Sequence, residues 1–166
     1  MSSINLRRGG RNMPEKKTLE RAREDARVGK SPSTQAGEFV REEMHHIREG
    51  KHGAASPKQA IAIGLSKARR SGVKLAPPRG GKTSARTRQK ATRDYEKGQS
   101  HSRRKPSARR SRATTEALKK EGRSAASHRS LSRQAQSAAR KRGSTSRRNA
   151  AKKASRTRRS HSRSRS

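Results

Sequence analysis

The second half of the chain holds almost nothing from which a hydrophobic core is built. Between Pro77 and Ser166 the large apolar side chains are Tyr95, Leu118 and Leu131. The same stretch carries 30 Lys and Arg against four Asp and Glu. Low hydrophobicity with high net charge is typical of disorder, because too little apolar surface is buried to offset chain entropy. We therefore expect residues 77–166 to form a disordered tail rich in Arg, Lys, Ser and Ala.

The remaining composition limits the class of protein. The chain has a formal net charge of +35 over 166 residues and no cysteine, which excludes a disulfide framework or a thiolate metal site. No apolar stretch approaches the roughly 18 residues that a membrane span requires. We therefore expect a cytoplasmic protein that does not bind membranes.

The first half has the pattern of a small helical module. After a basic, disordered N-terminus at 1–13, the module at 14–76 contains three helices, at about 14–28, 33–49 and 56–71. The fold class is therefore mostly α and disordered: a two- or three-helix module before a long basic tail. Its core is so small that self-association is an expected way of stabilising it.

The helix at 56–71 has the clearest start and stop signals. Ser56 is an N-cap, Pro57 stands at the first helical position, and Gln59 completes a capping-box pattern. Gly72 is a natural left-handed stop. Gly64, in a row of small residues, predicts a close helix crossing, with Phe39 or Met44 packed onto it; a glycine merely tolerated in mid-helix is the alternative.

The tail points to a polyanionic partner. Arg and Lys neutralise phosphates and release counterions, and this binding needs no fixed geometry. Solubility alone needs a net charge of only a few units. Residues 113–121 and 125–142 have the composition to become helical once their charges are neutralised. We expect binding to DNA, duplex in preference to single strand, because Tyr95 alone is no stacking platform.

The function expected is therefore that of a sequence-nonspecific DNA-binding or DNA-condensing protein, nucleoid-associated and histone-like. An RNA- or ribosome-associated protein is one alternative, and an adaptor whose helical hairpin binds a protein partner is another. The residues expected to bind nucleic acid are Lys67, Arg69, Arg70, Arg103, Arg104, Lys105, Arg109, Arg110, Arg112, Arg140, Lys141, Arg142, Arg147, Arg148, Lys152, Lys153, Arg156, Arg158 and Arg159.

No constellation of side chains predicts catalysis, and we expect no enzyme, cofactor or small-molecule substrate. His45 and His46 are adjacent in a helix and point to different faces, and with His52 they lack a further well-spaced ligand. The sequence therefore predicts no metal site. Glu42 and Glu43 form a carboxylate pair, but no pocket is expected that would shift their pKa values.

Two segments carry a resemblance to known proteins. Residues 39–53 and the helix Lys58–Arg69, with its run KQAIAIGLSKAR, are similar to a group of small, basic bacterial proteins of uncharacterised function. The resemblance covers about residues 14–78 and implies a bacterial source and a two- or three-helix unit. The tail resembles linker-histone-like and protamine-like DNA condensers in composition only.

Overall fold

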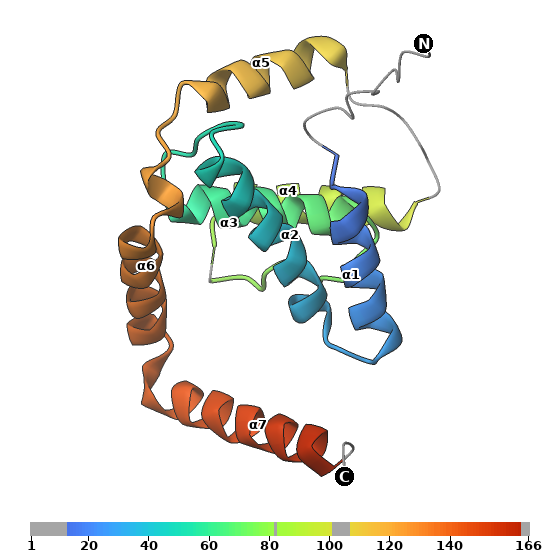
Figure 1. The fold of residues 1–166 in the computed structure, drawn as a ribbon, viewed down its shortest axis with the longest axis vertical. Coiled ribbons are helices and arrows are strands. Elements are labelled where there is room, and N and C mark those ends of the chain that lie inside the picture. Colours follow the sequence, from blue (N-terminus) through green and yellow to red (C-terminus); the bar gives the residue numbers. More distant parts are fainter. Residues whose placement is uncertain (1–12, 82, 101–106, 164–166) are drawn as a thin grey trace, which may run out of the picture. The chain divides into compact units, whose positions relative to one another are not determined.

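The computed structural model describes residues 13–81, 83–100 and 107–163, and the chain divides into two compact units, Met1–Ser127 and His128–Ser166. The first unit contains α1 (Lys16–Arg27), α2 (Pro32–Arg48), α3 (Pro57–Arg70), α4 (Ala85–Gln99), α5 (Ala108–Lys119) and a 3-10 helix, η1 (Ser124–Ala126). The second unit contains α6 (His128–Lys141) and α7 (Gly143–Arg163) (Figure 1).

The three helices predicted in the first half are present as α1, α2 and α3, close to their expected bounds. The start of α3 follows its sequence: the Ser56 Oγ accepts a hydrogen bond from the Gln59 N–H at 3.2 Å. The Gln59 side chain accepts one from the Ala55 N–H at 2.8 Å, so it satisfies a donor one residue earlier than the capping box predicts. Gly72, at φ +93°, ends the helix.

The core of the first unit lies where α2 packs against α1 and α3. Its buried members are Ala22, Ala36, Phe39, Ala68 and Val73, with Leu19, Leu65 and Leu75 partly buried beside them. Phe39 and Ile47 are fully buried, and each such side chain contributes about 1.5–3 kcal/mol. Val28, by contrast, is 55% exposed at the C-terminal end of α1.

The predicted close crossing at Gly64 is confirmed, with a different partner. A Cβ at this position would lie 2.7 Å from the Cα of Val40, so α2 and α3 meet backbone to backbone. Neither Phe39 nor Met44 is the residue that packs onto the glycine. The crossing is therefore closer than the sequence indicates.

The expectation of a long disordered tail is wrong, and the module does not end at residue 76. α4 packs along α3 (Figure 1). Ala91 is buried, and the Ser66 hydroxyl donates to Asp94 at 2.5 Å. A Cβ at Gly98 would collide with the carbonyl oxygen of Arg69. Small side chains thus provide the close packing that a search for large apolar residues overlooks.

The segment around η1 closes over the loop between α2 and α3. The Gly53 N–H donates to the Leu118 carbonyl at 2.9 Å, and the Ala54 N–H donates to that of Gly122 at 3.1 Å. The Arg48 guanidinium donates to the Ala126 carbonyl at 2.9 Å. These three hydrogen bonds tie a part of the expected tail into the first unit.

The remainder of the expected tail is helical as well. The segments expected at 113–121 and 125–142 correspond to α5 and α6, and α7 has no predicted counterpart. α5 and α6 bury no residue, so packing does not explain them. Their Ala, Arg, Lys and Gln residues have high intrinsic helix propensity, a local preference that a core-based argument leaves out.

Candidate nucleic-acid interface and a buried polar cluster

Most of the predicted nucleic-acid-binding residues lie exposed on the helices that replace the expected tail. On α5, the exposed ones are Arg109, Arg110 and Arg112. The part of the chain from α6 to α7 exposes the others, namely Arg140, Lys141, Arg142, Arg147, Arg148, Lys152, Lys153, Arg156, Arg158 and Arg159. Arg103, Arg104 and Lys105 lie outside the described residues.

The fold of α7 arranges its cations in a stripe. Arg148, Lys152, Arg156 and Arg159 are spaced by four, four and three residues, which places them on one face of a helix. At a rise of about 1.5 Å per residue, the stripe extends about 16 Å along the helix axis. We call these four residues the α7 stripe.

α6 carries a second basic face. Arg129, Arg133 and Arg140 recur at helical spacing and are exposed. A surface hollow of about 400 Å³ lies along this face. It is lined by Arg133, Gln136, Ser137, Arg140 and Lys141. The lining offers guanidinium, ammonium, amide and hydroxyl donors and no carboxylate, which suits an anion.

Two of the predicted contacts in the first unit are not at the surface. Lys67 is 3% exposed and Arg69 is 8% exposed, so neither is placed to reach a phosphate. The Arg69 Nε donates to the Leu75 carbonyl at 3.2 Å, and burial lowers the pKa of this guanidinium. Arg70 is exposed and lies 3.7 Å from Asp94. Their position in the last turn of the helix did not show that Lys67 and Arg69 are buried and that Arg70 is exposed.

Lys67 belongs instead to a buried polar cluster. Its Nζ lies 2.7 Å from Glu43 Oε2 and 3.8 Å from Glu42 Oε1. Glu43 is fully buried and Glu42 is 6% exposed. The contact to Glu43 is short, but its angles are not those of a hydrogen bond, and Nζ and both Glu43 oxygens lack such a bond. The pair is therefore close but incompletely satisfied.

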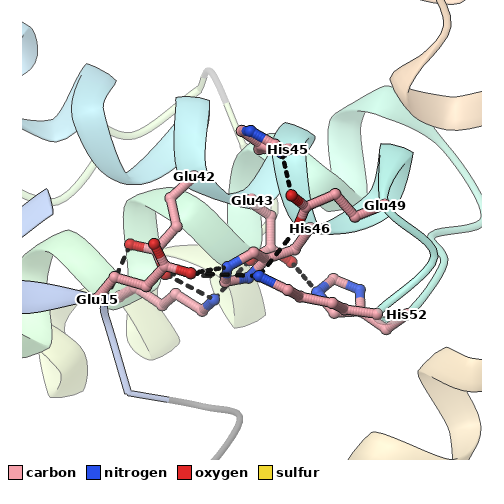
Figure 2. A network of polar contacts seen from close by, with 9 residues as sticks. Glu15, Glu42, Glu43, His45, His46, Glu49 and His52 are labelled. Atoms are coloured by element: carbon pink, nitrogen blue, oxygen red, sulfur yellow. Dashed lines mark hydrogen bonds and ion pairs between the residues drawn. The ribbon is translucent and has the colours of Figure 1, made fainter. Parts of the chain in front are cut away.

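Two histidines face these carboxylates. His52, in the loop after α2, places its Nε2 3.4 Å from Glu43 Oε1. His46, on α2, places its Nδ1 4.0 Å from Glu42 Oε1, and its Nε2 forms a 2.8 Å hydrogen bond with Glu15 Oε1. Figure 2 shows these side chains converging from the start of α1, from α2 and from the loop.

The outer edge of the cluster is partly exposed and charged. Lys51 contacts Glu49 at 2.9 Å and Glu15 at 3.3 Å. The hydrogen bond with His46 lowers the pKa of Glu15, with partial burial opposing it, and the bond with Lys51 lowers the pKa of Glu49. His45 lies outside the cluster, where its Nδ1 meets Glu49 at 3.1 Å (Figure 2).

The structure brings together a potential ligand set that the sequence did not reveal. Adjacent His45 and His46 do point apart, as expected. The loop, however, returns His52 to His46, and ligand atoms of Glu43, His46 and His52 all lie within 4.8 Å of one another. The spacing Glu43–His46 spans one helical turn, which is the signal in the sequence that could have indicated a shared face.

A pocket of about 300 Å³ between α1 and α2 reaches the edge of the cluster. Glu15, Arg41, Glu42, His46 and Lys51 are among its lining residues. Solvent and small ions therefore have a path to the His46 side of the buried cluster.

Comparison with known proteins gives a match that lies in the first unit. In the described parts of the chain, no helix combines the length and apolar character needed to cross a membrane. No curated protein and no solved structure gives a match to the chain. Residues 29–80, which include α2, the loop and α3, match the model of a family of unknown function, DUF6496.

Proposed function

We propose that the chain binds duplex nucleic acid, DNA in particular, through the exposed basic faces of α6 and α7, by contacts to phosphates and without reading base sequence. The observation that supports this most is charge separation. From His128 to Ser166 there are 14 Lys and Arg and no Asp or Glu. A surface of one sign draws a polyanion and has no carboxylates of its own to compete for the cations.

The arrangement of these cations suits a phosphate backbone. Duplex DNA carries a charge about every 1.7 Å along its axis, so the α7 stripe, about 16 Å long, lies beside several phosphates in any register. Arg adds bidentate contacts to phosphate oxygens. The helix holds the cations on one side, which a flexible chain does not do.

Other modes of recognition have less support. Base readout needs Asn, Gln or Arg held in a groove in register, and stacking on single strands needs aromatic side chains. The two aromatic residues are Phe39, which is buried, and Tyr95 on α4. Structured RNA presents the same phosphates, so it is the competitor to test against DNA at matched salt.

The test neutralises the four cations of the α7 stripe and compares this variant with one in which four cations elsewhere are neutralised. The variant Arg148→Gln, Lys152→Gln, Arg156→Gln and Arg159→Gln is titrated with a fluorescent duplex over a salt series. The control changes four exposed cations of the first unit: Lys16→Gln, Arg23→Gln, Lys58→Gln and Lys74→Gln.

A plot of log affinity against log salt concentration should be less steep for the stripe variant, with the magnitude of its slope lower by about 3 to 4. Each of the four phosphate contacts removed contributes about 0.9 to that slope. The control should lose much less. Equal losses in both variants would mean that affinity follows total charge, and the proposed interface would be wrong.

A further inference from the structure

We propose that Glu43, His46 and His52 form a binding site for one divalent transition-metal ion, Zn²⁺ in the first place. The ligand types fit: two imidazoles and one carboxylate are a common three-ligand set for zinc, with a fourth position left to water. The three ligand atoms lie within 4.8 Å of one another. This inference is independent of the nucleic-acid interface on the second unit.

The distance between His52 and Glu43 fits a shared metal ion better than a shared proton. Two ligands about 2.0–2.1 Å from a tetrahedral zinc ion lie about 3.3–3.4 Å apart. His52 Nε2 and Glu43 Oε1 are 3.4 Å apart. A charged N–H···O⁻ hydrogen bond is shorter, about 2.7–2.9 Å. Glu43 Oε1 is buried and has no hydrogen-bond partner.

The outer hydrogen bonds of both rings leave the correct nitrogens for a metal. His52 Nδ1 lies 3.1 Å from the Gly53 carbonyl, which only accepts, so Nδ1 carries the proton. When Nε2 carries no proton, its lone pair faces the Glu43 carboxylate, and a cation between them removes that repulsion. In the same way, His46 Nε2 donates to Glu15 and leaves Nδ1 as the ligand. Metal-bound histidines typically have such outer partners.

Glu43 divides its two oxygens between two cations. Oε2 lies 2.7 Å from the Lys67 ammonium, whereas Oε1 is the oxygen that faces His52. Lys67 therefore does not occupy the proposed metal position. Its charge instead fixes the orientation of the carboxylate ligand, as an outer partner does.

The charges of the cluster also leave room for a divalent ion. The charged groups that are buried are Glu42, Glu43 and Lys67. Before the histidines are counted, these groups leave one negative charge uncompensated, which is costly in an interior and which a bound cation offsets. The same ion links the start of α1, α2 and the loop through His46 and its partner Glu15.

The test is calorimetric titration of ZnCl₂ into the metal-free, full-length protein. We expect one ion per chain, and a higher melting temperature in the presence of Zn²⁺ because the ion binds the folded state. His52→Ala and Glu43→Gln should each weaken binding by about tenfold or more. His45→Ala is the matched control, an exposed neighbour outside the cluster, and should bind as the wild type does.

Co²⁺ provides a second readout. The wild type should give the visible absorption of a tetrahedral cobalt site, and His52→Ala, checked for folding by circular dichroism, should not. Absence of Zn²⁺ binding by the wild type would overturn the proposal, and so would equal binding by His52→Ala and His45→Ala. A doubly protonated His52 ring at neutral pH with no metal bound, seen by NMR, would show that a proton fills this position instead.

Discussion

At Gly64, α2 and α3 approach until a Cβ would lie 2.7 Å from the Cα of Val40. A close crossing here was predictable, although its partner Val40 was not, because the small residues Ala60, Gly64 and Ala68 recur at four-residue spacing within one helix. The contacts of Gly53 with Glu121 and of Gly98 with Arg69 were not, since the partner lies on another segment and leaves no local pattern. The same limit hid the approach of His52 to His46.

Substitution of Gly64 by alanine tests whether close packing outweighs helix propensity in its effect on stability. Gly64→Ala should lower the free energy of unfolding by about 1–3 kcal/mol, because the added methyl group has no space beside Val40. Gly37→Ala, in α2 with nothing within 4 Å of a Cβ, should raise it by about 0.5–1 kcal/mol. Urea unfolding followed by circular dichroism measures both. Equal effects of the two changes would contradict the observed crossing.

At the level of helices, local signals predicted some elements and missed others. Ser56, Pro57 and Gly72 mark both ends of α3, so the sequence alone was enough there. α4 was missed because it packs through Ala91 and Gly98, which count little in a hydrophobicity argument. α7 was missed because the argument from charge treated a lack of core as a lack of structure, although Ala, Arg and Lys favour helix locally.

The helical form of α7 should matter for binding, beyond its charge. Ala151→Pro leaves every cation in place but removes a backbone hydrogen bond in mid-helix, at a cost of about 3 kcal/mol. We expect weaker circular dichroism at 222 nm and several-fold weaker duplex binding. Ala151→Ser is the control and should change neither by much. Unchanged affinity in the proline variant would mean that a stripe is not required.

Over the whole molecule, acidic residues and surplus cations are kept apart. All 12 Asp and Glu lie before residue 122, where the buried cluster of Glu43, Lys67 and the histidines uses several of them. The unit His128–Ser166 has only cations among its charged side chains. The sequence revealed this asymmetry of charge, and the structure adds that the cations are displayed on helices.

The most direct test of this account is the salt dependence of duplex affinity for the full chain and for a chain that ends at Ser127, the limit of the first unit. The full chain should show a steep linear fall of log affinity with log salt, and the shortened chain a shallower slope and weaker binding. A shortened chain that kept the affinity and slope of the full one would contradict the central claim, as would binding that salt does not weaken.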